Sequence, residues 1–371
     1  MSEDINTRAV LKVNGRSFKK WKSINVDRSI AQITGSFSFT TSNKFAGENE
    51  KWEITTGDKC VVEIAGQKVV TGYIDDIDDG YDIGSHNITF SGRDKTADLV
   101  DCNFDIFTNE SEFKNQTFIQ IIKKLCSPFG VTVELDLELL SDTALAKPMQ
   151  DYKVETGQKV FEQIAILCQQ YAVLPITTGE GILHITRAGL NRAFDTLESG
   201  KNIKANKLKQ SDKNRYSIYY TITNGGNTGT AFNTKLIAEG KETDEYIEKS
   251  RDRPLIISIG EQVADDGGAQ KRADWESRIR AGGSRKVETV VKGWVQSTGD
   301  LWPLNGLVQE IDKKIGIDGV FLIAGINLNL DGNGGELTTM SLVHPDTFVL
   351  KNRVPIKANN GLNAYGKSLK K

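Results

Sequence analysis

The sequence predicts an α+β protein that is mainly β, with two similar antiparallel β-barrel modules and two small α/β domains. Three observations predict this fold class. Short runs of alternating apolar and polar residues, separated by turn residues, fill the first hundred positions, which is typical of antiparallel strands. Helical periodicity enters in the next hundred, and the alternation returns after Asn202. A series of strand and turn features near the N-terminus also recurs near the C-terminus.

Length and charge limit the possible functions. A chain of 371 residues exceeds a single hydrophobic core, so we expect two to four domains. The net charge of -2 and the pI near 6.1 argue against a duplex-binding protein, which usually carries a basic surface. No apolar run reaches the ~18 residues that span a bilayer, and the first residues lack a signal-peptide pattern. We therefore expect synthesis in a cytoplasm and no stable membrane insertion.

The four cysteines do not suggest a metal site or a redox pair. Cys60, Cys102, Cys126 and Cys168 form no CxxC motif, and each lies in an apolar context. We expect them to be small, buried residues that stay reduced.

Residues 1–98 are predicted to form the first β-barrel. Phe37 and Phe39 alternate with serines and threonine, and about six such strands with short connections indicate a closed or nearly closed antiparallel barrel. The segment Asp78–Ser85 is rich in Asp and Gly and is predicted to turn. Asp94 is the predicted N-cap of the short helix that follows.

Residues 99–200 are predicted to form a small α+β domain. One amphipathic helix is expected over Thr117–Cys126. A second is expected over Gly157–Tyr171, with Thr156 as its N-cap. Leu174–Thr186 reads as a hairpin, because two apolar runs flank a turn that contains glycine.

The rest of the folded chain is predicted to hold a second β-barrel with an insertion. The barrel combines residues 201–240 with residues 305–350, and residues 241–304 form the inserted α/β domain. Within the insertion we expect a buried strand over Leu255–Ile259 and a helix over Asp265–Ala281 with one apolar side.

Two stretches of the chain share one order of features. A strand that ends in Glu-Ile precedes a long strand with Gly near its centre, an Asp-Gly turn and a strand with threonine. The matched segments are Cys60–Ile64 with Leu307–Ile311, Val69–Asp76 with Phe321–Leu328, Asp79-Gly80 with Asp331-Gly332, and Asn87–Ser91 with Glu336–Ser341. They are either related β modules or two ordinary hairpins that look alike. Related modules in a cyclic trimer would give a ring of six, which could join a three-fold object to a six-fold one.

Four phrases in the chain resemble one protein family when they are taken in order. They are GYIDDIDDG…GRDKTADLVDC (Gly72–Cys102), ETGQKVFEQIA (Glu155–Ala165), NRYSIYY (Asn214–Tyr220) and RDRPLIISIG…KRADWESRIRAGG…VKGWVQSTGDLWPLNGLV (Arg251–Val308). The set resembles the baseplate hub proteins of Mu-like contractile-tailed phages. More loosely, it resembles the hubs of other myophages and the hub part of type VI secretion VgrG spikes.

The resemblance implies a structural virion protein of the tail baseplate, assembled in the cytoplasm of the bacterial host. It implies a homotrimer whose two β-barrels per subunit form a pseudo-six-fold ring. The ring would join the hexameric tail tube, or adjacent baseplate proteins, to the trimeric cell-puncturing spike. It also implies that the second barrel is built from the segment after Asn202 and the segment before Pro345. Whether the host element is an active phage or a prophage is left open.

No catalytic, cofactor or metal site is predicted. The acidic cluster between Asp75 and Asp82 does not match EF-hand spacing and reads as a solvated turn. The three histidines, His86, His184 and His344, lie on separate segments and form no metal-binding motif. A tail-associated peptidoglycan hydrolase or a cell-wall-binding module is the alternative function, because acids are abundant and one sequence gives no distances.

A group of tryptophans and arginines is the candidate protein interface. Its members are Trp275, Arg278, Arg280, Trp294 and Trp302. Such residues could also form a nucleic-acid or carbohydrate surface, and some tryptophans are expected to be core. The net negative charge and the family resemblance favour a protein interface without nucleic-acid recognition. The basic tail, residues 351–371, is predicted to be flexible, and it either stays solvated or orders on a partner such as the spike.

Overall fold

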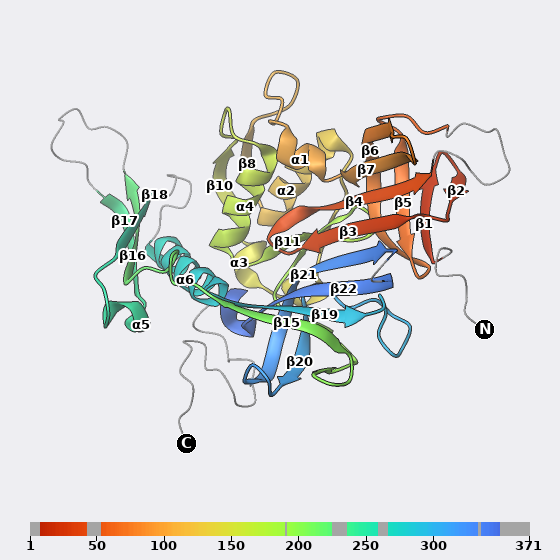
Figure 1. Cartoon of the computed structure of the whole chain (residues 1–371). Helices are drawn as coiled ribbons and strands as arrows, with labels where there is room; N and C mark the ends of the chain where they lie inside the picture. The colour runs from red at the N-terminus through yellow and green to blue at the C-terminus, as the bar shows by residue number, and fades with distance from the viewer. Residues whose placement is uncertain are drawn as a thin grey trace.

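One large, mostly antiparallel sheet organises the molecule (Figure 1). The computed structural model describes residues 8–42, 53–189, 191–224, 236–258, 266–332 and 335–348. Within these ranges the sheet has 14 strands, which confirms a mainly β protein. Its main path runs through β15 (Ile203–Gln210), β19 (Arg285–Lys292), β22 (Gly335–Val343), β21 (Ile317–Asp331), β3 (Ser23–Ser29), β4 (Gln32–Ser42), β7 (His86–Asp94), β6 (Gln67–Tyr81), β5 (Lys59–Ile64), β1 (Ala9–Val13) and β2 (Arg16–Phe18). β20 (Gly306–Asp312) pairs with β21, β13 (Asn191–Arg192) and β14 (Leu197–Glu198).

Alternation along the strands separates an apolar face from a polar one. β4 lies between β3 and β7. Its Phe37 and Phe39 are buried, whereas its Ser36 is exposed. Successive side chains of a strand point to opposite faces, so the apolar residues of both ends of the chain meet in one core. In that core the ring of Trp21 meets the ring of Phe39 edge to face, with centroids 4.9 Å apart.

The two halves of the sheet repeat one strand arrangement. β5, β6 and β7 are consecutive antiparallel partners, as are β20, β21 and β22. A register shift lies between Ile74 and Asp76 in the β6–β7 pair, and another lies between Ile323 and Gly325 in the β21–β22 pair. Because Asp76 and Gly325 are each the first paired residue after the shift, they occupy corresponding positions in the two halves. The sequence comparison instead matches Asp76 with Leu328, because local patterns do not fix the register between strands.

The two halves are joined edge to edge, and within the described ranges neither closes into a barrel. The second part of β21 pairs antiparallel with β3, from Gly325 opposite Ser29 to Leu330 opposite Ile24. Figure 1 shows this junction as blue strands beside red ones. The expected closed or nearly closed barrels are corrected here, because the outer edge of β21 is paired with the other half and not with a strand of its own.

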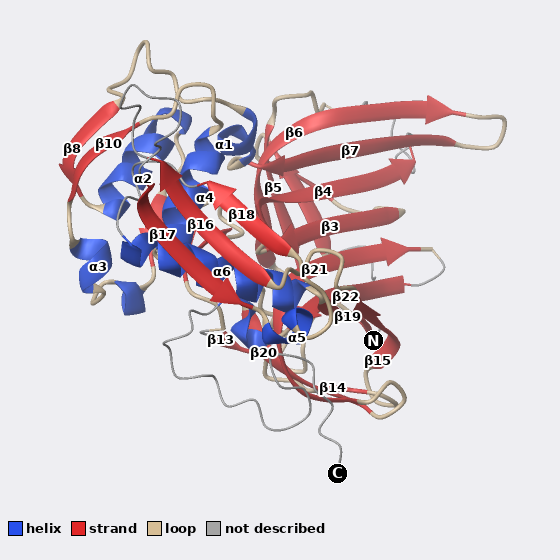
Figure 2. Ribbon diagram, turned by 90° about the vertical axis from the view of Figure 1, so that its left-hand side faces the viewer, coloured by secondary structure: helices blue, strands red, loops and turns tan. Residues whose placement is uncertain are grey.

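A layer of helices and small sheets lies at one end of the large sheet (Figure 2). Its elements are α1 (Ala97–Asp101), β8 (Glu112–Gln116), α2 (Phe118–Cys126), η2 (Ser127–Phe129), β9 (Val133–Leu135), η3 (Leu137–Leu139), α3 (Thr143–Ala146), β10 (Met149–Lys153), α4 (Val160–Gln170), β11 (Leu174–Thr177) and β12 (Leu183–Thr186). Apolar residues of α2 and α4, including Ile121 and Ile164, form a separate core. Both amphipathic helices expected from the sequence are confirmed in type and approximate position.

The starts of two helices differ from the sequence predictions. Thr96 precedes α1 in place of Asp94, because the Asp94 carboxylate accepts the backbone N–H of Gly35 at 2.8 Å. α4 begins after Lys159 and not after Thr156. There the backbone N–H of Lys159 donates to the Glu162 carboxylate at 3.0 Å, which fixes the helix start.

A small three-stranded sheet and one long helix form the third part. Its elements are β16 (Ile218–Asn224), β17 (Leu236–Thr243), α5 (Glu245–Glu248), β18 (Pro254–Ser258), α6 (Asp266–Gly283) and, packed on α6, η5 (Pro345–Phe348). β16 pairs antiparallel with β17 and parallel with β18. α6 lies between this sheet and the rest of the molecule (Figure 1). β18 is an edge strand with Ile256 65% exposed, which corrects the expectation of a buried strand.

Strand pairing crosses two of the predicted domain ranges. β19, from the predicted range 241–304, is a strand of the large sheet. β16, from the predicted range 201–240, belongs to the small sheet. The domain limits themselves stay a prediction, and the basic tail, residues 351–371, lies outside the described residues.

Two local predictions near the first hairpin are also corrected. β6 continues to Tyr81, so most of the acids lie on a strand and only Asp82–Ser85 turns. Cys102 is exposed, whereas the other three cysteines are buried as expected.

Candidate assembly surface

The polar face of the large sheet is the candidate site. We call it the polar sheet face, and its uncharged members are Asn25, Ser36, Ser38, Thr40, Thr89, Ser91, Asn327, Asn329, Thr339 and Ser341. Hydrogen bonds run across it between strands. The hydroxyls of Thr40 and Thr89 lie 2.9 Å apart, and the Asn327 amide donates to Oδ1 of Asn25 at 2.6 Å. Figure 2 shows these strands side by side, with helices at only one end.

Opposite charges mark the two ends of the polar sheet face. Asp76 and Asp78 on β6 form the acidic edge, and both are exposed. Lys207 and Lys209 on β15, with Lys286 on β19, form the basic edge. Lys209 lies directly opposite Lys286, a like-charge pair that disfavours an isolated sheet. No ion pair within the described part of the chain involves these five side chains.

A cleft of ≈ 690 Å³ lies where α4 and α6 approach the polar sheet face. Phe161, Trp275 and Phe348 line its apolar wall, and Asp27 and Lys286 lie on the sheet side. In the described ranges no group of His, Cys, Asp and Glu could hold a metal ion.

None of the described helices has both the length and the apolar surface needed to cross a membrane.

The structure separates the residues of the predicted Trp–Arg interface. Trp275 is 3% exposed and packs in one core with Phe348, whereas Trp294 and Trp302 are buried in the core of the large sheet. The indole N–H of Trp294 donates to the carbonyl of Asn329 at 3.0 Å. The tryptophans are thus interior residues of this chain and do not form one surface.

The two arginines of that prediction lie on α6 and are partly exposed. Arg280 donates to Glu276 at 3.1 Å, and its guanidinium lies 5.4 Å from the ring of Tyr216. Whether Arg278 and Arg280 contact another protein stays a prediction.

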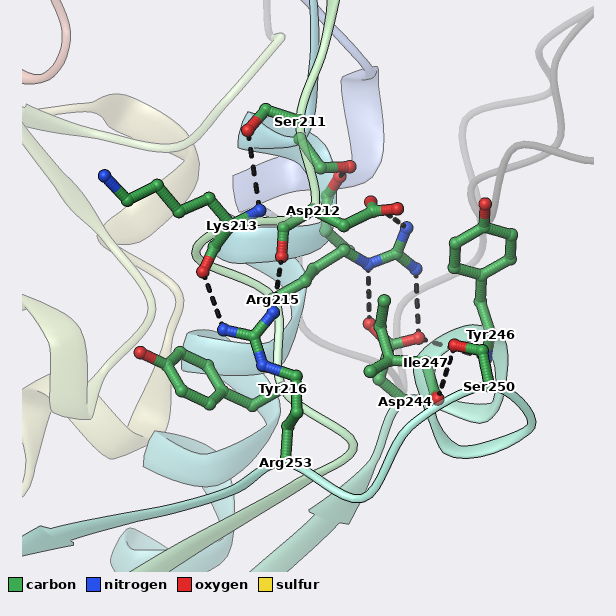
Figure 3. A network of polar contacts seen from close by, with 12 residues as sticks. Ser211, Asp212, Lys213, Arg215, Tyr216, Asp244, Tyr246, Ile247, Ser250 and Arg253 are labelled. Atoms are coloured by element: carbon green, nitrogen blue, oxygen red, sulfur yellow. Dashed lines mark hydrogen bonds and ion pairs between the residues drawn. The ribbon is translucent and has the colours of Figure 1, made fainter.

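A buried ion pair that the sequence alone does not reveal joins two segments of the third part of the chain (Figure 3). Arg215 donates to both carboxylate oxygens of Asp244, at 2.7 and 2.9 Å, and both side chains are buried. Asp244 also accepts the backbone N–H of Tyr246 at 3.2 Å, so it caps α5. Arg253 donates to the carbonyls of Asp212 and Lys213, at 3.0 and 2.8 Å. The cap at Asp244 was the one local signal available in the sequence.

The burial of two carboxyl groups was not predicted from the sequence. Burial raises the pKa of Asp94 to about 7, although Gly35 and Thr71 donate hydrogen bonds to it. Burial likewise raises the pKa of Glu310 to about 7, against hydrogen bonds from Asn206 and Thr289. They lie in different halves of the sheet and do not form an acid–base pair. Each accepts hydrogen bonds from strands of its own half, so we interpret both as groups that stabilise the fold.

Three family models match separate parts of the chain. Residues 8–94 match the N-terminal domain of the Mu phage baseplate assembly protein GpP-like family. Residues 96–187 match the second domain of the baseplate hub protein gp44-like family. Residues 266–351 match the fourth domain of the Mu phage baseplate assembly protein GpP.

Known proteins match almost the whole length of the chain. It is 31% identical to the baseplate hub protein gp44 of Escherichia phage Mu, over 97% of this chain and 95% of that protein. The crystal structure of the 43 kDa tail protein of prophage MuSo2 from Shewanella oneidensis has a TM-score of 0.77 and 35% identity, and covers 92% of this chain and 99% of its own.

A more distant likeness concerns the fold alone. A component of the type VI secretion system of E. coli has a TM-score of 0.52 and 10% identity, and covers 96% of this chain and 78% of its own. The match with gp44 extends over both halves of the sheet and both smaller parts, as the resemblance in the sequence indicated. The chain belongs to the gp44 family of baseplate hub proteins of Mu-like phages, and it is a structural component of the phage tail baseplate.

Proposed function

We propose that three copies of this chain form a closed ring that joins the hexameric tail tube to the trimeric cell-puncturing spike. The protein acts by matching symmetries and transmitting force, with no chemical step of its own. It assembles in the cytoplasm of the bacterial host, with the spike and the tube or adjacent baseplate proteins as partners.

The repeated strand arrangement carries this proposal. β5–β6–β7 and β20–β21–β22 share the same pairing and the same position of the register shift. One copy therefore supplies two similar modules, and a cyclic trimer supplies six. Such a ring has three-fold symmetry in its chains and nearly six-fold symmetry in its modules, which fits a trimer on one side and a hexamer on the other.

The polar sheet face is the proposed inner wall of the ring. Its middle carries Ser, Thr and Asn side chains, such as Ser38, Ser91 and Asn327, and few charges. Such groups hydrogen-bond water and hold neither anions nor cations strongly. A polymer could therefore pass along this wall without being retained.

The smaller parts take the outer positions in this proposal. The first module comprises residues 1–98 and the helical part residues 99–200. The large-sheet strands after residue 201 form the second module, with α6 and the small sheet as the insertion. Arg278 and Arg280, which are partly exposed on α6, are the proposed contacts to adjacent baseplate proteins.

Light scattering behind size-exclusion chromatography tests the ring. The expected mass is about three times the 40.9 kDa of one chain. Electron microscopy of the same peak should show a ring with six lobes. A protein that stays monomeric over micromolar concentrations contradicts the proposal.

A further inference from the structure

Two strand edges on the polar side of the large sheet, one on β15 and one on the second part of β6, have no partner strand in the described part of the chain. Apart from one isolated bridge between Ile203 and Ser199, β15 pairs only with β19, so the outer edge of its second part, which includes Lys207 and Lys209, is open. β5 pairs with β6 only up to Tyr73, and beyond it, from Asp76 to Tyr81, β6 pairs only with β7. Open edges of this length normally bind another strand or are protected from doing so.

The junction inside the chain shows what such an edge can bind. In the second module, the part of β21 that extends beyond β20 pairs antiparallel with β3. β3 is the strand at the edge of the first module. In the first module the corresponding part of β6, from Asp76 to Tyr81, pairs with β7 on one side and has no described partner strand on the other. The strand of the second module that corresponds to β3 is β15.

Strand registers make this correspondence residue by residue. Ser91 lies opposite Ser38, which lies opposite Asn25 of β3. Ser341, the counterpart of Ser91, lies opposite Glu288, which lies opposite Lys207 of β15. The residues two positions further along are also counterparts: they are Asp27 of β3 and Lys209 of β15.

We propose that β6 of one copy pairs antiparallel with β15 of the next copy in the ring, with Asp78 directly opposite Lys209. Asp78 is the counterpart of Asn327, because both follow the register shift by the same distance. Asn327 lies opposite Asp27 in the junction inside the chain. The proposal rests on the trimeric ring proposed above and names the strands that close it.

Charge makes this junction directional. Asp78 on β6 would lie directly opposite Lys209 of the second copy across the new pair of strands. Asp76 would be a diagonal neighbour of Lys209, and Lys207 a diagonal neighbour of Asp78. The second copy's Lys209 would then have an acidic neighbour on one side, beside Lys286 on the other. Two β6 edges repel each other, and so do two β15 edges. Only the head-to-tail contact is favourable, and a repeated head-to-tail contact closes into a ring of three when each copy is rotated by about 120° from the last.

Disulfide trapping tests the register directly. Asp78→Cys and Lys209→Cys are combined in a chain whose exposed Cys102 is changed to Ser, because the other three cysteines are buried. Directly opposed residues in an antiparallel pair have Cα atoms ~4.5–5.5 Å apart, which suits a disulfide. Mild oxidation should give a covalent trimer on a denaturing gel without reductant.

Two matched pairs control the trapping. Asp27→Cys with Asn327→Cys should form a bond within one chain, because these residues are opposite each other in the structure. Asp78→Cys with Lys286→Cys should form no bond, because Lys286 lies one strand further away.

Charge exchange tests the same junction without oxidation. Reversing Asp76 and Asp78 to Lys, or Lys207 and Lys209 to Asp, should raise the concentration needed for half-assembly about tenfold or more. Combining both reversals should restore assembly. Circular dichroism of each variant checks that the exposed substitutions leave the fold intact.

The outcomes separate the junction from the ring. A trimer that neither cross-links through Asp78 and Lys209 nor responds to either reversal overturns the junction and leaves the ring standing. A monomer at every concentration, together with a positive Asp27–Asn327 control, overturns both. A cross-linked trimer with restored assembly in the combined reversal supports both.

Discussion

The backbone N–H of Gly35 donates a 2.8 Å hydrogen bond to Oδ2 of Asp94, and a Cβ on Gly35 would lie 2.7 Å from that same oxygen. Oδ1 of Asp94 also accepts the backbone N–H of Thr71 at 3.2 Å. One buried carboxyl group therefore holds β4 and β6 to the end of β7. Its tight fit explains why this acid is not available to cap α1.

Asp94 should make stability depend on pH. Burial raises its pKa from 3.8 to about 7, so the folded protein holds the proton more tightly than the unfolded chain does. Its contribution to the free energy of unfolding is therefore largest at acid pH and falls as the pH rises from about 4 to about 7. Urea unfolding of the wild type and Asp94→Asn across this range should show a difference that changes with pH. A difference in unfolding free energy that does not change with pH would contradict the raised pKa of Asp94. Glu310 is present in both proteins, so its own titration cancels in the comparison.

Gly72 should tolerate no side chain, whereas Gly80 on the same strand should. A Cβ at Gly72 would lie 1.8 Å from the carbonyl oxygen of Arg93, but a Cβ at Gly80 would meet no atom within 4 Å. Gly72→Ala should cost about 3 kcal/mol of unfolding free energy, because the paired strands must move apart. Gly80→Ala should change it by less than about 0.5 kcal/mol. Thermal and urea unfolding measure both, and equal effects would count against this close approach.

Removal of Asp244 should loosen the small sheet. Asp244→Ala leaves the buried guanidinium of Arg215 without its main partner, which should cost about 3–5 kcal/mol. Asp212→Ala is the matched control, since Asp212 is more exposed and lies 3.7 Å from the same guanidinium. It should cost less than about 1 kcal/mol. Hydrogen exchange of β16–β18 should accelerate only in Asp244→Ala, and unchanged exchange there would refute the role.

Trp275 and Arg278 should separate folding from assembly. Trp275→Ala removes a buried ring and should cost about 3–5 kcal/mol of unfolding free energy. Arg278→Ala should leave stability within about 0.5 kcal/mol and weaken binding to adjacent baseplate proteins. Unfolding experiments measure the first effect and co-sedimentation with purified baseplate proteins the second. Unchanged co-sedimentation removes Arg278 from the proposed interface.

Local patterns in the sequence were enough to find most strands and helices. The alternation around Phe37 and the apolar spacing in Phe118–Cys126 determine which face of each element is buried. They could not reveal the pairing of β21 with β3, because Asn327 and Asn25 are 302 residues apart. Closed barrels were predicted for the same reason, since an alternating strand does not show which strand completes its edge.

The candidate site was less predictable than the fold. Trp275, Trp294 and Trp302 are favoured at interfaces and in cores alike, and only packing distinguishes the two. The acids of β6 were predicted to lie in a solvated turn, because Asp and Gly are common in turns. Their relation to the lysines of β15 depends on the order of strands in the sheet, which no short segment encodes.

The pairing of β21 with β3 sets the order of events during synthesis. β3 leaves the ribosome early, but its partner is made nearly 300 residues later, so the first half cannot complete its sheet while the chain is growing. Its edge stays open throughout that time and is exposed to mispairing with other nascent chains. Completion of the sheet therefore reports that the chain has been translated almost to its end, and in a truncated chain that lacks β21 one edge of β3 would stay open while the other pairs with β4.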